Sequence, residues 1–200
     1  MKIVSLLGNG PSLKNISLED ICSTSNFLIG CNRIYLHNDY EKIKNNIIVA
    51  FSDKSFRQMK EEIRFHVPLD RMIFTSDLQL NDTCSKINVK RYNQHHGSSV
   101  MAVKNLINYP NVFELSSVFT TIVLPYTFHL LPDRVNIYGV DMSYFVGSKF
   151  KPYFYEYSKN KSYSWSPKQA KQWSERFSNE LNAQLDYFRK EGVEVNGINS

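Results

Sequence analysis

Cysteine is scarce in this sequence, and no long hydrophobic run is present. The three cysteines, Cys22, Cys31 and Cys84, are an odd number without a C-x-x-C pair, which argues against a disulfide framework and a cysteine-based zinc site. The N-terminal MKIVSLL holds one lysine and an apolar run broken by a serine, which is too short for a signal peptide. No segment approaches ~18 uninterrupted apolar residues, so we expect no membrane span. These absences predict a reduced, cytoplasmic protein.

The composition excludes disordered, collagen-like and low-complexity chains. Of the 200 residues, 42% are hydrophobic and 22% charged, which is the balance of a globular protein. The length corresponds to about one domain. We therefore expect one domain over residues 1–200, and the early stop after the last predicted strand suggests a piece of a longer protein.

The net charge of +5 belongs to one segment. Residues 148–177 carry all of this excess, and the rest of the chain is neutral. An even spread would suggest nucleic acid, but a basic segment without an RNA-binding or zinc-finger pattern favours a small anionic ligand. The basic residues of this segment are Lys149, Lys151, Lys159, Lys161, Lys168, Lys171 and Arg176, against Glu156 and Glu175.

Short apolar runs alternate with helical patterns along the chain. This alternation predicts an α/β fold with a Rossmann-like, mostly parallel sheet flanked by helices. The expected strands are 2–7, 26–31, 46–51, 71–74, 86–92, 134–138 and 193–195. The expected helices are one capped by Ser17, then 55–66, 98–107, a buried helix over 117–131 in which Pro125 marks a kink or the true start, and a long helix over 167–189.

Residues 142–167 show no apolar periodicity. A connection of this length in a compact domain is usually functional, and we expect a Tyr- and Lys-rich lid with some helix of its own.

The loop after the first expected strand reads Gly8-Asn9-Gly10-Pro11-Ser12-Leu13. Two glycines allow a tight turn and a close approach to phosphate, whose charge backbone N–H groups would hold. The loop lacks the G-K-[ST] of a P-loop and the third glycine of G-x-G-x-x-G. A plain turn between strand and helix is the structural alternative.

Polar residues follow other expected strands as well. Asn32, Ser52 with Asp53, and Asp141 stand at such ends. Because ligands bind at the carboxyl ends of parallel strands, we expect these residues to converge with the loop on one cleft.

The GNGPSL loop, read with Gly30-Cys31-Asn32-Arg33 and Ile137-Tyr138-Gly139-Val140-Asp141, resembles the small bacterial sialyltransferases and related surface-polysaccharide proteins. That family has a Rossmann-type domain with a lid, and it transfers sialic acid from CMP-sialic acid with inversion and without a metal. The same loop occurs in relatives similar to pterin pyrophosphokinases.

The resemblance implies roles for particular residues. CMP would contact Gly8, Asn9, Gly10, Pro11, Ser12 and Asn32, with Ser52 and Asp53 where the family has a further asparagine. Ser116 and Ser117, before the apolar helix, resemble the helix start that holds the sugar carboxylate, although a simple helix cap explains Ser116 equally well. Tyr144 with Tyr153 or Tyr155 are the nearest counterparts of two lid tyrosines that hydrogen-bond the leaving phosphate; a Tyr-rich surface for a partner protein or membrane headgroups is the alternative.

One departure concerns the base. The family uses a histidine between the lid and the last long helix, yet no histidine follows His129. Replacements are Asp141, which would equally serve as a cap at the root of the lid, the loop residues His95 and His96, and Glu156.

The sequence thus predicts a glycosyltransferase that moves sialic acid or a similar acidic sugar from a CMP-activated donor to a glycan acceptor. We expect no metal, because the chain has no D-x-D motif, no cofactor beyond the donor, and no nucleic-acid partner. Peripheral membrane contact and homo-oligomerisation stay open. The alternatives are a Mg-dependent pyrophosphokinase-like enzyme and a non-catalytic nucleotide-sugar-binding component of a polysaccharide pathway.

Overall fold

The computed structural model describes residues 1–51, 61–74, 117–141, 145–146, 149–150, 153–154 and 166–197. Its centre is a six-stranded sheet in the order β4-β3-β2-β1-β5-β8, in which every pairing is parallel. The strands are β1 (Ile3–Leu7), β2 (Phe27–Cys31), β3 (Ile47–Phe51), β4 (Met72–Phe74), β5 (Arg134–Tyr138) and β8 (Glu194–Asn196). The α/β, parallel-sheet prediction is therefore confirmed.

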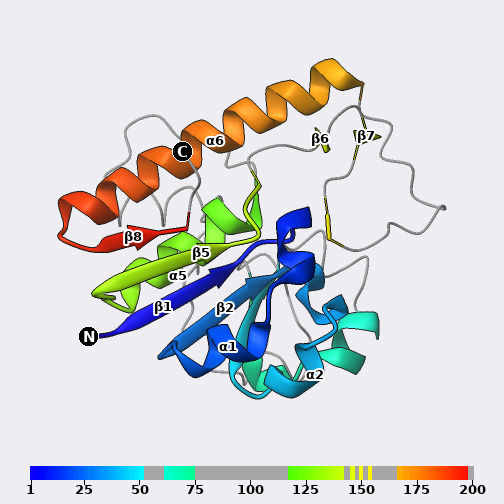
Figure 1. Cartoon of the computed structure of the whole chain (residues 1–200), viewed down its shortest axis with the longest axis vertical. Coiled ribbons are helices and arrows are strands. Elements are labelled where there is room, and N and C mark those ends of the chain that lie inside the picture. Colours follow the sequence, from blue (N-terminus) through cyan, green and yellow to red (C-terminus); the bar gives the residue numbers. More distant parts are fainter. Residues whose placement is uncertain are drawn as a thin grey trace.

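Helices cover both faces of the sheet (Figure 1). One face carries η1 (Pro11–Asn15), α1 (Leu18–Ser23), η2 (Asn32–Leu36) and α2 (Tyr40–Ile43). The other carries η5 (Phe119–Val123), α5 (Leu124–His129) and α6 (Pro167–Lys190). Residues 61–66 are also helical, and the short η3 (Leu69–Arg71) leads into β4.

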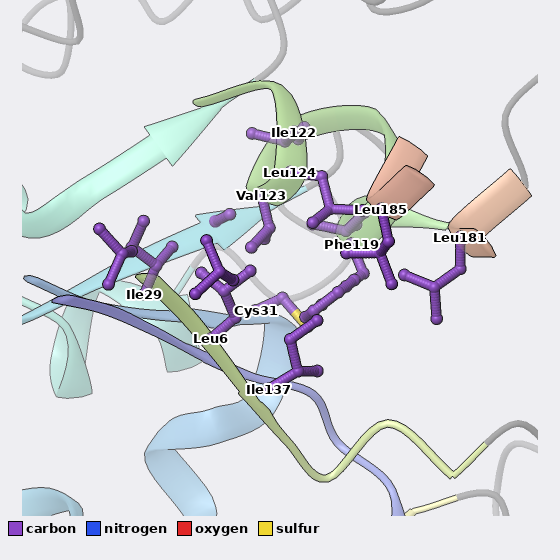
Figure 2. Close-up of a cluster of buried hydrophobic side chains, with 14 of the residues drawn as sticks. Leu6, Ile29, Cys31, Phe119, Ile122, Val123, Leu124, Ile137, Leu181 and Leu185 are labelled. Carbon is purple, nitrogen blue, oxygen red and sulfur yellow. The ribbon is translucent and has the colours of Figure 1, made fainter. Parts of the chain in front are cut away.

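Alternation along the strands divides the core into two clusters. In β1, Val4 and Leu6 face one side while Leu7 faces the other, as the two-residue period of a strand requires. Figure 2 shows one of these clusters, where side chains from β1, β2 and β5 meet those of η5, α5 and α6. Leu181 and Leu185 of α6 are fully buried in it, so the predicted last helix packs an apolar face against the sheet.

The predicted Ser17 cap is present, and α6 begins with a cap of its own. Ser17 accepts a hydrogen bond from the Asp20 N–H at the start of α1. Ser166 and Gln169 form a capping box at the start of α6, followed by Pro167 at its first position, where proline is well tolerated. Gly192, with a φ of +83°, follows the last turn.

Pro125 lies in the first turn of α5, which begins at Leu124, so the prediction that it marks the true start of the α-helix is confirmed. The turn before it is wider. Residues Phe119–Val123 form a π-helix, in which the Leu124 N–H donates to the Phe119 carbonyl. The next donor in this register would be residue 125, and proline has no N–H to give. The Thr120 carbonyl instead accepts a hydrogen bond of 3.0 Å from Nε2 of Gln184, a fully buried residue of α6.

The described residues of the expected lid include two short strands and a bend at Tyr153 and Phe154. β6 (Phe145–Val146) and β7 (Lys149–Phe150) pair antiparallel, apart from the main sheet. The helix expected within 142–167 is not found among the residues described there. The expected elements over 86–92 and 98–107 lie outside the described residues.

Candidate functional site

The sheet has its topological switch point between β1 and β5, because the chain leaves β1 towards β2 and later crosses back to β5. Ligands of such folds bind outside the carboxyl ends of the strands at this point. Here the two loops that flank the switch point are bonded to each other: the Gly8 N–H donates to the Tyr138 carbonyl at 2.8 Å, and the Gly10 N–H donates to the Gly139 carbonyl at 2.7 Å.

This bonding explains why residues 8 and 10 are glycine. A Cβ on Gly8 would lie 2.2 Å from the Gly139 carbonyl oxygen, and a Cβ on Gly10 would lie 2.2 Å from Oδ2 of Asp141. Both distances are far below van der Waals contact. The sequence assigned these glycines to the approach of a phosphate; the structure shows that they admit residues 139–141.

Asp141 completes the closure. Its Oδ2 accepts a hydrogen bond of 2.8 Å from the Ser12 N–H, and the Leu13 N–H donates back to the Gly10 carbonyl. The N–H groups of Gly8, Gly10, Ser12 and Leu13 are therefore all engaged within the protein. These four donors of the backbone cradle that the sequence suggested for phosphate are therefore occupied, and Asp141 acts as the cap of this loop.

Asn9 is held between β1 and β2. It exposes only 8% of its surface, and its Nδ2 donates to the Cys31 carbonyl at 2.9 Å. Its Oδ1 is buried and has no hydrogen-bond partner among the described residues. An unpaired buried acceptor is costly, so this atom is a candidate ligand contact.

Asn32, directly after β2, shows the same feature. Its Oδ1 is also buried without a partner in the described part of the chain, and its φ of +49° is left-handed, a conformation that asparagine adopts more readily than most residues. Because β1 and β2 are adjacent, two unsatisfied amide oxygens stand at neighbouring strand ends. Buried acceptors of this kind suit the N–H and O–H donors of a ligand.

Cys31 precedes Asn32 and bonds Asn9 through its backbone carbonyl, and its thiol is unreactive. Burial raises the pKa of its thiol to about 12, so it stays protonated at neutral pH. Its role here is to offer its backbone carbonyl to Asn9.

Phe154 attaches the expected lid to the loop. Its N–H donates to the Asn9 carbonyl at 2.9 Å, and its ring, 9% exposed, packs edge-on against His37 with centroids 5.5 Å apart. His37 bridges Leu13 and Asp39: its Nδ1 accepts from the Asp39 N–H, which makes Nε2 the donor to the Leu13 carbonyl at 3.1 Å. This attachment brings the half-buried Tyr153 next to the loop.

No sequence pattern singled out His37 or Phe154. Their link depends on a contact between segments more than 110 positions apart, and local periodicity carries no information about it.

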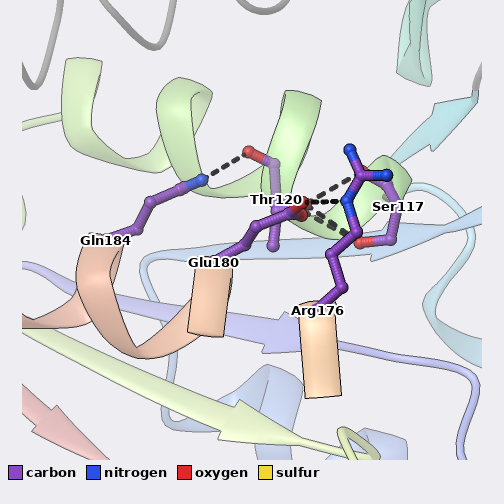
Figure 3. A network of polar contacts seen from close by, with 5 residues as sticks. All are labelled: Ser117, Thr120, Arg176, Glu180 and Gln184. Atoms are coloured by element: carbon purple, nitrogen blue, oxygen red, sulfur yellow. Dashed lines mark hydrogen bonds and ion pairs between the residues drawn. The ribbon is translucent and has the colours of Figure 1, made fainter. Parts of the chain in front are cut away.

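Ser117 caps the helix over 118–129. Its Oγ accepts from the Thr120 N–H at 3.2 Å, the role that the sequence offered as an alternative for its neighbour. Figure 3 shows the polar network that continues from it. The Thr120 hydroxyl lies 3.2 Å from Oε2 of the buried Glu180, and Glu180 Oε1 pairs with Arg176 Nε at 3.0 Å.

The basic segment is divided between two environments. Lys168, Lys171 and Arg176 lie on α6, where Lys171 is near Glu175 and Arg176 pairs with Glu180. Arg176 therefore pairs within α6, next to the contact that Glu180 makes with Thr120 of the helix over 118–129. The side chains of Lys149, Lys151, Lys159 and Lys161 lie outside the described residues.

Several predicted residues are outside the described ranges as well. They are Ser52, Asp53, Ser116, Tyr144 and Tyr155, together with His95, His96 and Glu156. The structure brings together Gly8–Ser12, Asn32, Asp141 and Tyr153 at one edge of the sheet; Ser117 stands at the start of a helix on the second face. Within the described ranges, no three His, Cys, Asp or Glu side chains group as metal ligands, and no helix has the length and apolar surface to cross a bilayer.

The fold and site define a doubly wound α/β protein in which the loop after β1 is bonded to the loop after β5, and in which side-chain amides follow β1 and β2. The solved structure of the sialyltransferase CST-II in complex with a trisaccharide acceptor and CMP is similar to this chain, with a TM-score of 0.53 and 15% sequence identity, covering 97% of this chain and 79% of that one. A second solved structure, of a tyrosine-to-phenylalanine variant of CST-II in complex with CMP, gives a TM-score of 0.49 and 16% identity over 98% and 80%.

The chain thus has the fold of the sialyltransferase CST-II, as the loop motif led us to expect. No protein-family profile matches the sequence. No curated protein matches it either.

Proposed function

We propose that this protein is a glycosyltransferase that moves sialic acid or a similar acidic sugar from a CMP-activated donor to a glycan, with inversion and without a metal ion. The observation that carries the proposal is the pair of buried, unpaired Oδ1 atoms of Asn9 and Asn32. Both are hydrogen-bond acceptors, and a cytidine offers donors in its amino group and ribose hydroxyls. The shared fold with CST-II, a protein solved with CMP, supports the same reading.

The orientation of Asn9 favours a donor group on the ligand. Because Nδ2 is bonded to the Cys31 carbonyl, turning the amide over would place Oδ1 against another oxygen. The site therefore keeps an acceptor at this point, which suits cytosine through its amino group better than uracil, which has a carbonyl at the same position.

In the proposed reaction the acceptor hydroxyl attacks the anomeric carbon of the sugar, the bond from that carbon to the phosphate oxygen breaks, and CMP leaves. Tyr153, together with Tyr144 or Tyr155 and the lid lysines, would hold the departing phosphate. Ser116 and Ser117 would orient the acidic sugar. We propose that the base that takes the hydroxyl proton is His95, His96 or Glu156 in preference to Asp141, because Oδ2 of Asp141 already accepts a hydrogen bond from the Ser12 N–H.

The attachment of Phe154 to Asn9 supports closure over a bound nucleotide. The same residue offers its side-chain oxygen to the ligand and its backbone carbonyl to the Phe154 N–H. The odd number of cysteines supports a reducing compartment, and we place the reaction in the cytoplasm.

The test is a calorimetric titration with CMP, UMP and ATP plus Mg²⁺. Wild type should prefer CMP, and Asn9→Ala or Asn32→Ala should weaken CMP at least about tenfold, the equivalent of one lost buried hydrogen bond. Asn182→Ala, on the exposed side of α6, is the matched control. Preference for ATP with Mg²⁺ would overturn the proposal in favour of a pyrophosphokinase-like enzyme.

Activity is tested separately with CMP-N-acetylneuraminic acid, by following CMP release with and without a glycan acceptor. CMP binding without hydrolysis or transfer would assign the protein to the non-catalytic alternative, for which the absence of histidine after His129 is the supporting observation.

A further inference from the structure

The carboxylate of Asp141 occupies the place that a bound phosphate takes in a glycine-rich loop. In such loops the glycines let an anion approach, and backbone N–H groups then bind it. Here the space above Gly10 is filled by Asp141, whose Oδ2 would lie 2.2 Å from a Cβ at that position. The N–H of Ser12, which would otherwise face an external anion, donates to the same oxygen at 2.8 Å.

Two further N–H groups of the loop are also used. Those of Gly8 and Gly10 bind the carbonyls of Tyr138 and Gly139, so residues 138–141 engage the N–H groups of Gly8, Gly10 and Ser12. A phosphate that entered this loop would find a fixed negative charge where it needs donors, and like charges at this separation repel each other strongly.

The nucleoside contacts are unaffected by this arrangement. The unpaired oxygens of Asn9 and Asn32 lie at the ends of β1 and β2, whereas the β5 loop that carries Asp141 is on the other side of β1. A nucleotide with one phosphate can use the two asparagines without the loop amides, since the tyrosines and lysines of the proposed lid would supply hydroxyls and cations. A nucleotide with a second phosphate has one more charge to place, and the loop that would ordinarily take it is occupied.

We propose that Asp141 is a specificity-determining residue, a built-in anion that rejects nucleoside diphosphates and so restricts the site to nucleotides with a single phosphate. This inference rests on the proposed function, and it concerns the phosphate chain of the donor and not its base or sugar.

The experiment compares the affinities of CMP and CDP, both without metal, for wild type and for Asp141→Asn. Asparagine retains an acceptor for the Ser12 N–H but removes the charge. We expect wild type to bind CDP at least about tenfold more weakly than CMP, as repulsion between two close charges of a partly exposed site predicts. Asp141→Asn should reduce the ratio of the dissociation constants of CDP and CMP at least about fivefold, because the repelling charge is removed.

The matched control is Asp133→Asn. Asp133 also accepts a hydrogen bond from a backbone N–H, that of Lys2, but it stands at the opposite, amino end of the sheet next to β5. Its substitution should leave the CDP to CMP ratio unchanged. Circular dichroism and thermal melting establish that each variant is folded.

A measurement on wild type alone covers the case in which Asp141→Asn does not fold. Because the repulsion acts between charges in contact with solvent, raising NaCl from about 0.05 to about 0.5 M should lower the ratio of the dissociation constants of CDP and CMP. The inference is overturned, and the proposed function left standing, if wild type binds CMP and CDP with equal affinity. The same holds if neither salt nor a folded Asp141→Asn variant changes the ratio of the dissociation constants of CDP and CMP. Failure of wild type to bind CMP overturns both.

Discussion

The side-chain amide of Asn9 is fixed by the backbone of the neighbouring strand, since its Nδ2 donates to the Cys31 carbonyl at 2.9 Å. The bond joins the ends of β1 and β2 and decides which atom of Asn9 is left for a ligand. Substitution of one atom in this amide is therefore informative.

Asn9→Asp replaces the Nδ2 donor by an oxygen that faces the Cys31 carbonyl. We expect it to lower the free energy of unfolding by roughly 1–3 kcal/mol, the cost of a buried polar group without a partner, and to abolish detectable CMP binding. Urea unfolding and calorimetry measure the two effects. Asn182→Asp, exposed on α6, should change neither, and an Asn9→Asp variant as stable as wild type would contradict the assigned orientation.

Gly8→Ala tests the closed switch point. The new Cβ would meet the Gly139 carbonyl oxygen at 2.2 Å and Cγ2 of Val140 at 2.8 Å, and backbone cannot move aside as a side chain can. We expect a loss of stability of about 1–3 kcal/mol or more. At Gly30 the nearest atoms are Cγ1 and Cγ2 of Ile34, at 3.0 Å, so Gly30→Ala should cost clearly less. Equal unfolding midpoints for the two variants would argue against this account of the loop.

Gln184 and Pro125 should be energetically coupled. Gln184→Leu leaves the Thr120 carbonyl buried without its donor, at a cost of roughly 1–3 kcal/mol. In Pro125→Ala the chain regains an N–H at the next position of the helix, so the same Gln184 substitution should cost less. A double-mutant cycle by urea unfolding should give an interaction energy of at least about 0.5 kcal/mol. If the two changes in the free energy of unfolding simply add, the hydrogen bond from Gln184 does not compensate for the missing N–H of Pro125.

Cys31 should resist alkylation in the folded protein. With a thiol pKa of about 12, less than about one molecule in a thousand carries the reactive thiolate at pH 8. Iodoacetamide at that pH should modify the half-buried Cys22 well before Cys31, as peptide mass spectrometry can show. In urea both should react at similar rates, and rapid labelling of Cys31 without denaturant would show that the ends of β1 and β2 open.

The sequence predicted the main elements because their signals are local. β5 has the predicted bounds, Arg134–Tyr138, since a short apolar run is followed at once by a glycine. α6 matches within one residue, because Ser166 with Pro167 marks its start and its apolar face repeats with helical spacing. The motif after β1 likewise predicted the fold, which CST-II shares.

The hydrogen bonds between distant segments that form the site could not be predicted in the same way. Ser12 and Asp141 are 129 positions apart, and no pattern in either segment indicates that one side chain fills the loop of the other. The sequence suggested that the glycines make room for a ligand phosphate, whereas in the structure they make room for residues 139–141. The π-turn before Pro125 similarly depends on a partner from α6, which a local pattern cannot supply.

The attachment of α6 also bears on the order in which the chain can finish folding. One edge of β5 pairs with β1, which precedes it in the sequence, and the other edge pairs with β8, which follows α6. The Thr120 carbonyl likewise accepts its hydrogen bond from Gln184 of α6. During synthesis these groups stay unpaired until α6 and β8 have left the ribosome. Contacts between distant segments form slowly, so the nascent chain passes through a stage with an unpaired strand edge and a bare apolar helix face, the features that attract chaperones and invite aggregation.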